Sequence, residues 1–452
     1  MQRSNAKPTV KKFYGPNTRK WLAFHKKFAA QSTYEDFIVW DRKAPAIGPF
    51  FTDVDGNVFL DFASHVATTA LGYNHPQLIG VAKRLAGIDP DRYAGSDFIS
   101  GYGKNPAKME IPTPSHLHKK LLEITRQFGF QKSYFTNSGA EAVENAIKLC
   151  YATRKNYGYG FCFKGAFHGR TLGALSLNRS KLPHRKWYPQ IPKIISLPYC
   201  ICQNICKCGW QTMSRKDKLM NALEQWLDKE IGLIAPEEVA FIILEPIQGE
   251  GGYKIPQKKF IQEVYKIARR NNIPIISDEV QAGMGRTGTW WAVEHFDCKP
   301  DIISAGKALR IGATIGKKRF FPTEEARISS TWGEGNAIAT AIGYKTIEII
   351  QKQKLLKNAE KMGKYFLKRL WEINDYCRGC LFDVRGIGLM IVADFLTKKD
   401  RDKIKKECLK KGLLLLSCGY KGIRFLPPLN VNKREIDLAC NVLQEVVRGI
   451  KR

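Results

Sequence analysis

The sequence has no long apolar run. A membrane-spanning helix needs about 18 or more consecutive apolar residues, and no segment of the 452-residue chain approaches that length. Residues 1–7 contain no apolar core of signal-peptide length. Internal repeats and low-complexity segments are also missing. We therefore expect a globular, cytoplasmic protein with no membrane partner.

Acidic residues are scarce relative to basic ones. Lys and Arg together number 73 and Asp and Glu 42, which gives a formal net charge of +31. Such a charge attracts nucleic acids and other anions. The basic residues are spread along the whole chain, however, and no helix-turn-helix or RNA-binding signature is present. We expect no specific nucleic-acid partner.

Cysteine, by contrast, is frequent, with 12 residues. In a large chain without a secretory signal these should be reduced thiols. Cys200, Cys202, Cys206 and Cys208 form a C-x-C-x3-C-x-C pattern. Four thiolates can close a tetrahedral zinc site, but the usual spacing of zinc-binding cysteines is about C-x2–4-C. The pattern therefore favours free thiols on a surface loop, with a structural zinc site as the alternative.

Apolar strands alternate with amphipathic helices between residues 115 and 335. Such alternation predicts an α/β fold with a mostly parallel sheet covered by helices. A hairpin is expected at 50–62, where two apolar runs flank Asp55 and Gly56, a type I′ turn signal. The expected strands are 133–136, 161–163, 239–245 and 273–277, and the expected helices between them are 139–153 and 257–271.

Three segments follow from this pattern. Residues 1–70 form an N-terminal arm and hairpin, and residues 71–335 form a large α/β domain. Residues 336–452 mix helices with strands, and we expect them to join the N-terminal segment in a small α+β domain.

Polar residues follow three of the expected strands. Ser138, in NSGAE (137–141), opens a helix; Asp278 ends a strand; and Lys307 follows the apolar segment 301–306. Ligands of open parallel sheets bind at such strand ends. Taken singly, Ser138 and Asp278 are explained as helix caps and Lys307 as a solvated strand tip. Together they offer a phosphate cradle, an anion for a ring cation and an amine for an aldehyde, which are what pyridoxal 5′-phosphate requires of a protein.

Seven sequence blocks carry a family resemblance over roughly residues 45–450. The chain resembles the class III aminotransferases, which have the pyridoxal-phosphate-dependent transferase fold of type I. The resemblance implies a large, mostly parallel, seven-stranded sheet domain with a small α+β domain. The blocks are YFTNSGAEA (134–142), GAFHGRTL (165–172), EPIQGEGG (245–252), SDEVQAGMGRTG (277–288), GKA (306–308), STWG (330–333) and RFLPPL (424–429).

The resemblance implies a role for each cofactor-binding position. Lys307 would form the Schiff base with the cofactor and shuttle a proton, and Asp278 would pair with the protonated pyridine nitrogen. The other positions are Gln281 at the ring oxygen, Phe167 stacked on the ring, and Ser138, Gly139 and Ala140 at the phosphate.

The resemblance also implies a homodimer. Thr331 would reach the phosphate of the cofactor bound by the other subunit. The alternative is an ordinary loop threonine with no role at the cofactor.

The resemblance also implies four substrate-binding residues. Arg424 would bind an α-carboxylate with its two-pronged guanidinium, although an ordinary surface ion pair is the alternative. Glu250 would neutralise Arg424 when the substrate lacks that carboxylate, and Arg170 would hold the distal carboxylate. Val66 stands where ornithine-type enzymes carry a tyrosine.

The implied reaction moves the terminal amino group of an ω-amino acid to 2-oxoglutarate. Several blocks favour L-lysine as donor, with 4-aminobutyrate a close competitor. The segment after Lys307 departs from the family because it lacks the usual glycine run, which leaves the substrate open. An amino-acid racemase or epimerase on the same fold, and an ornithine- or acetylornithine-type aminotransferase, are the alternatives.

Overall fold

The computed structural model describes residues 1–30, 38–87, 99–154, 158–203, 205–213, 219–324, 327–328, 336–377 and 379–449. Contacts divide the chain into two compact units. The first comprises Met1–Ile79 with Lys357–Arg452, and the second comprises Gly80–Leu356. Within the described residues, no helix combines the length and the apolar character needed to cross a membrane.

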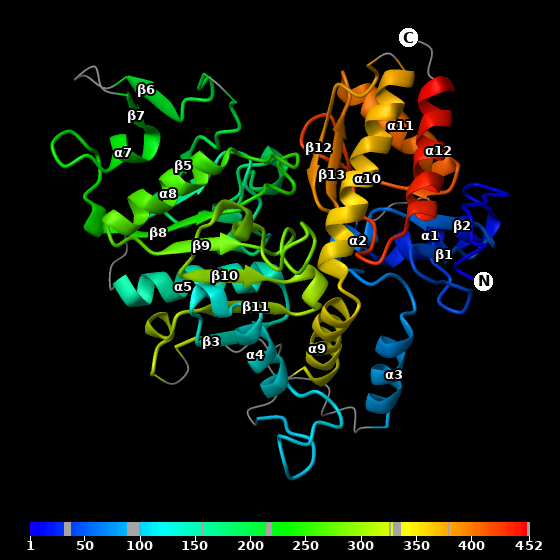
Figure 1. Cartoon of the computed structure of the whole chain (residues 1–452), viewed down its shortest axis with the longest axis horizontal. Coiled ribbons are helices and arrows are strands. Elements are labelled where there is room, and N and C mark those ends of the chain that lie inside the picture. The colour runs from blue at the N-terminus through cyan, green and yellow to red at the C-terminus, as the bar shows by residue number, and fades with distance from the viewer. Residues whose placement is uncertain are drawn as a thin grey trace. The chain divides into compact units, whose positions relative to one another are not determined.

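A seven-stranded sheet forms the centre of the second unit, with strand order β3-β11-β10-β9-β8-β4-β5 (Figure 1). β11 is antiparallel to both of its neighbours, and every other pair is parallel. The expected large, mostly parallel, seven-stranded sheet is therefore confirmed. The strands are β3 Lys132–Thr136, β4 Tyr159–Phe163, β5 Ile194–Leu197, β8 Val239–Leu244, β9 Ile275–Asp278, β10 Ile302–Ala305 and β11 Gly312–Gly316.

The strands of this sheet are apolar on both faces, which requires cover on both sides. Along β4, Cys162 belongs to the apolar core shared with helix α5 (Gly139–Arg154). The next residue, Phe163, points to the opposite face and packs against Phe260 of helix α8 (Lys258–Arg270), with ring centroids 5.8 Å apart. Helices therefore cover both faces of the sheet.

The remaining elements of this part of the chain are shorter or lie beside the sheet. They are α3 Pro76–Leu85, α4 Pro114–Glu123, α6 Leu172–Ser176, β6 Gln211–Met213, β7 Leu219–Asn221, α7 Ala222–Trp226 and α9 Ala337–Lys352.

The first unit joins the two ends of the sequence. β14 pairs in parallel with β2, and Arg3 forms an ion pair with Glu435 at 2.7 Å. A second sheet, with strand order β12-β13-β16-β15, is antiparallel throughout. The elements are α1 Pro16–Phe28, β1 Phe50–Thr52, β2 Val58–Asp61, α2 Ser64–Ala67, α10 Leu355–Tyr376, β12 Asp383–Ile387, β13 Met390–Asp394, α11 Lys398–Lys410, β14 Leu413–Leu414, β15 Leu416–Cys418, β16 Gly422–Phe425 and α12 Lys433–Gly449.

The hairpin expected at 50–62 is present, but its turn is not of type I′. β1 and β2 pair from Phe50↔Leu60 to Thr52↔Val58, which leaves five residues in the connection. The Asp53 carboxylate accepts hydrogen bonds from the backbone N–H groups of Asp55 (2.9 Å) and Asn57 (2.8 Å). This side chain closes the turn, and only Gly56 needs a left-handed conformation, with φ of 80°.

The expectation of reduced thiols is wrong for one pair of cysteines. Cys377 and Cys380, beyond the end of α10, form a disulfide with their Cα atoms 5.5 Å apart. That separation lies within the range a disulfide can bridge. The other ten cysteines, all within the described residues, are not part of a disulfide.

Candidate functional site

The parallel strands of the large sheet end along one edge, which we call the carboxyl edge. Asp278, the last residue of β9, pairs in register with Ser304 of the neighbouring β10. Lys307 comes three residues further on and begins a short 3-10 turn, Lys307–Leu309, where its side chain is partly buried. Adjacent parallel strands thus bring the predicted carboxylate and the predicted amine to the same edge.

The Asp278 carboxylate is buried and hydrogen-bonded through both of its oxygens. Oδ2 lies 2.7 Å from Nδ1 of His168, and Oδ1 accepts the backbone N–H of Val280 at 3.0 Å. An ionised carboxylate only accepts hydrogen bonds, so Nδ1 of His168 is the donor. The backbone N–H of His168 in turn donates to Oδ1 of Asn178 at 2.6 Å.

His168 is the residue that the sequence reasoning missed. It lies directly after Phe167 in the block GAFHGRTL (165–172), and this position is the only sign in the sequence that it belongs to the site. The side chain is buried, and within the described part of the chain its Nε2 atom has no hydrogen-bond partner. Its contact with Asp278 joins the segment after β4 to the end of β9.

The start of helix α5 also lies at the carboxyl edge. Ser138 N–H donates to the Glu141 carboxylate at 2.9 Å, and Ser138 Oγ accepts the Glu141 N–H at 3.3 Å. The Ser138 side chain therefore caps helix α5, which agrees with the alternative explanation of this residue drawn from the sequence. The first N–H groups of the helix, including those of Gly139 and Ala140, have no intrahelical partner and can still receive an anion.

Two glycines allow the helix start to lie against the strand ends. A Cβ atom on Gly306 would lie 3.2 Å from Cα of Gly139, and one on Gly312 would lie 2.1 Å from the carbonyl oxygen of Ser138. Any larger residue at Gly312 would push the helix start away from the sheet. At the helix start itself, Ser138 is exposed and Gly139 and Ala140 are partly buried, so this part of the backbone can be reached by a phosphate group.

A buried carboxylate, Glu245, connects two loops of the carboxyl edge. It follows β8 and accepts the N–H groups of Phe167 (2.9 Å) and Gly249 (2.8 Å). Burial raises the pKa of Glu245 to about 7; the interaction with His168 opposes this rise, and the Asp278 charge adds to it. Gln281, three residues beyond β9, accepts a hydrogen bond from the Tyr253 hydroxyl at 2.9 Å.

Two of the predicted substrate residues lie in the second unit. Glu250 forms an ion pair with Lys181, with Oε1 and Nζ 2.5 Å apart. Arg170 is exposed, in the segment that follows Phe167 and His168.

The other two belong to the first unit. Arg424 lies on β16 and is buried, so it is not a surface residue. Val66 belongs to a turn in which Ser64, His65, Val66 and Ala67 all have positive φ. The buried Asp61 carboxylate stabilises this strained turn by accepting the Ser64 N–H at 2.8 Å. Thr331 lies outside the described residues.

Comparison with known proteins gives consistent matches over most of the chain. The family model "Aminotransferase class-III" matches residues 34–447. Alanine/serine racemase of Pyrococcus horikoshii is 32% identical over 89% of this chain and 84% of its own length. A probable 4-aminobutyrate aminotransferase of Bacillus subtilis is 31% identical over 88% of this chain and 90% of its own.

Solved structures show the same likeness. Lysine aminotransferase from M. tuberculosis superposes with a TM-score of 0.81. It is 25% identical, and the match covers 95% of this chain and 98% of that protein.

The raised pKa of Glu245 generates a spectroscopic prediction. Burial favours the protonated acid, so Glu245 should be mostly protonated at pH 6 and mostly ionised at pH 8. Infrared difference spectra between these pH values should contain a protonated-carboxyl band that Glu245→Gln removes. Glu279, whose pKa burial raises to about 8, is the internal control and should still titrate. An unchanged band in Glu245→Gln would contradict the assignment.

Proposed function

Because the chain belongs to the class III aminotransferase family, which depends on pyridoxal 5′-phosphate, we propose that it acts on an ω-amino acid. The terminal amino group of L-lysine or 4-aminobutyrate passes to 2-oxoglutarate, giving a semialdehyde and L-glutamate. One observation carries the site: Asp278 ends β9, and Lys307 lies just beyond the end of the adjacent parallel strand β10, at the edge where α5 begins.

Bound pyridoxal 5′-phosphate supplies an aldehyde that combines with an amine and a ring that withdraws electrons from it. We propose that the phosphate is held by Ser138 and by the N–H groups of Gly139 and Ala140. The partial positive charge at the start of α5 favours an anion there, and Gly139 and Ala140 are only partly buried.

Asp278 holds a proton on the ring nitrogen in this proposal. Its buried carboxylate presents a negative charge fixed by His168 and by the Val280 N–H. A negative charge beside a protonated nitrogen raises that nitrogen's pKa, and each pKa unit corresponds to about 1.4 kcal/mol. His168 is a positioning residue, because it acts on the ring only through Asp278. Phe167 would pack on the ring, and Gln281 would donate a hydrogen bond to the ring oxygen.

Lys307 moves the proton. Its amine would hold the cofactor. The same amine would serve as the base that takes the proton from the substrate carbon carrying the transferred nitrogen.

Arg424 and Glu250 decide which substrate end is accepted. We propose that the Arg424 guanidinium binds the α-carboxylate of 2-oxoglutarate through two parallel hydrogen bonds. An ω-amine donor has no carboxylate at its reacting end, and a buried charge without a partner costs several kcal/mol. Glu250 supplies the missing anion in that half-reaction. Arg170 binds the distal carboxylate, and Val66 leaves space that a tyrosine would occupy.

Two relatives support this substrate class. The B. subtilis relative is named as a probable 4-aminobutyrate aminotransferase, and the M. tuberculosis structure is of a lysine aminotransferase. Both names refer to ω-amino acids. A homodimer is part of the same proposal, with Thr331 of one subunit reaching the phosphate in the other.

Amino-acid racemisation is the second candidate. The similarity to alanine/serine racemase, at 32% identity over 89% of the chain, favours it, and the same lysine chemistry permits it. The two functions separate when an amino donor is added without an acceptor. A transaminase leaves its amino group on the cofactor, which changes the absorption spectrum, whereas a racemase accumulates no aminated cofactor. Screening donors with 2-oxoglutarate and measuring glutamate then identifies the substrate.

The role of Asp278 predicts the effect of Asp278→Asn. The substitution keeps the volume but removes the charge, so we expect turnover to fall by about 100-fold or more while the cofactor still binds. Asp301→Asn is the matched control, because Asp301 is buried at the start of β10, paired with Arg269 and Lys317. That variant should lower the thermal midpoint and leave turnover close to wild type. Equal turnover in Asp278→Asn and wild type would reduce Asp278 to a helix cap.

If Glu250 takes the place of the substrate carboxylate as the partner of Arg424, substitutions of these two residues should affect different half-reactions. Glu250→Ala should slow the half-reaction with the ω-amine at least about tenfold more than the half-reaction with glutamate. Arg424→Lys should chiefly slow the glutamate half-reaction, because an ammonium group cannot reproduce the two parallel hydrogen bonds. Single-turnover spectra measure each half-reaction separately.

The control for these variants is Glu360→Ala, which removes an exposed carboxylate paired with Lys364 on α10. It should leave both half-reactions unchanged. If Glu250→Ala slows both to the same degree, Glu250 does not act as the alternative partner of Arg424.

A further inference from the structure

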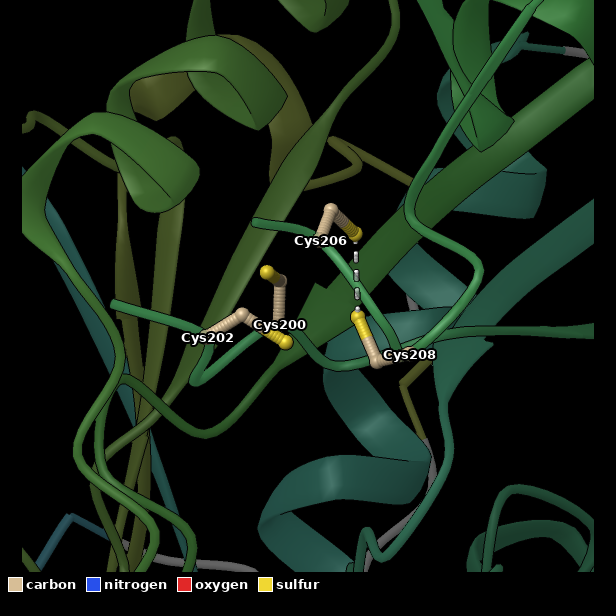
Figure 2. A group of neighbouring side chains, drawn as sticks. All are labelled: Cys200, Cys202, Cys206 and Cys208. Atoms are coloured by element: carbon tan, nitrogen blue, oxygen red, sulfur yellow. Dashed lines mark hydrogen bonds between the residues drawn. The ribbon is translucent and has the colours of Figure 1, made fainter. Parts of the chain in front are cut away.

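Four cysteine sulfurs meet in the loop that follows β5. The Sγ atoms of Cys200, Cys202, Cys206 and Cys208 all lie within 4.8 Å of one another. Figure 2 shows the four side chains gathered around a common space, with Cys206 and Cys208 3.5 Å apart. Zinc bound by four thiolates at about 2.3 Å places its ligands about 3.8 Å apart. The observed separations therefore suit a single tetrahedral ion.

The geometry shows how the unusual C-x-C spacing brings the two pairs together. The backbone N–H of Lys207, within the second pair, donates to Sγ of Cys202 in the first pair at 3.4 Å. Gly209 has a φ of 83°, which turns the chain so that the Gln211 N–H donates to Sγ of Cys206 at 3.2 Å. N–H groups directed at sulfur stabilise the negative charge of a metal-bound thiolate.

Apolar burial contributes little to the stability of the described residues of this loop. Its two large apolar residues, Ile201 and Ile205, are 41% and 75% exposed. Of the four cysteines only Cys200 is buried. A loop without a core of its own needs another cross-link to offset the entropy of ordering its backbone.

Two buried aromatic residues fix the ends of the loop. Tyr199 and Trp210 stand immediately outside the cysteine cluster, and both rings pack on Phe260 of α8, with centroids 5.2 Å and 4.7 Å away. Trp210 also donates from Nε1 to the carboxylate of Glu263 at 3.1 Å. The four sulfurs are therefore carried by a short segment that is held at both ends.

We propose that Cys200, Cys202, Cys206 and Cys208 bind one zinc ion as a structural site. Four protein thiolates leave no open position for a substrate or water, so the ion has no direct part in catalysis. The site nevertheless adjoins the carboxyl edge. The Tyr199 hydroxyl donates to the carbonyl oxygens of Glu245 (3.0 Å) and Pro246 (2.9 Å), at the start of the segment that contains Glu250.

Elemental analysis of the untagged full-length holoenzyme tests the site. Protein produced in zinc-supplemented medium and dialysed against metal-free buffer should retain about one zinc ion per chain. Removal of this zinc with a chelator should lower the thermal midpoint, and added Zn²⁺ should restore it. Co²⁺ added to the zinc-free protein should give the intense visible absorption of tetrahedral cobalt thiolate. These measurements use the wild-type chain and do not depend on turnover.

Variants then assign the ligands. The double variant Cys202→Ser/Cys206→Ser should retain at least about tenfold less zinc than wild type. The matched control is Cys377→Ser/Cys380→Ser, which removes the C-x2-C pair that forms a disulfide and should leave zinc content unchanged. Wild-type protein without zinc, iron in its place, a disulfide within the cluster, or undiminished zinc in the first variant would each overturn the proposal.

Discussion

A charged carboxylate at the end of a buried strand can persist only where other groups compensate its charge, because an uncompensated buried ion costs several kcal/mol. Asp278 meets this condition through His168 at 2.7 Å and the Val280 N–H at 3.0 Å. The contact with His168 connects the end of β9 to the segment after β4. Glu245, after β8, reaches the same segment through the N–H of Phe167. The ends of three strands are therefore held together by one buried polar network.

This network explains how the carboxyl edge can hold several chemical groups in fixed positions. The parallel strands bring Asp278 and Lys307 together, and the glycine contact between Gly306 and Gly139 places the start of α5 beside them. Rigid elements position reactive side chains more accurately than loops do. The proposed substrate residues come from both units of the chain. Glu250 pairs with Lys181, and Arg424 lies on a strand of the other unit.

Periodicity was enough to predict the α/β sheet, helix α5 and the strands that carry Asp278 and Lys307, because local patterns determine those elements. It could not predict His168 as the partner of Asp278, since 110 residues separate them in the sequence and only the folded chain brings them within hydrogen-bonding distance. The hairpin turn is not the predicted type I′ turn, because the Asp53 side chain closes it. Spacing rules favoured free thiols at the four cysteines, because such rules do not show that the fold brings all four sulfurs within 4.8 Å of one another.

The central claim is that the Lys307 amine is the group that holds the cofactor. Borohydride reduction of the protein loaded with pyridoxal 5′-phosphate, followed by peptide mass spectrometry, tests it most directly. We predict a single modified lysine, Lys307, and no modification in a Lys307→Ala variant that keeps the wild-type circular dichroism. Attachment to another lysine in the wild-type protein, or modification that persists undiminished in Lys307→Ala, would contradict the account.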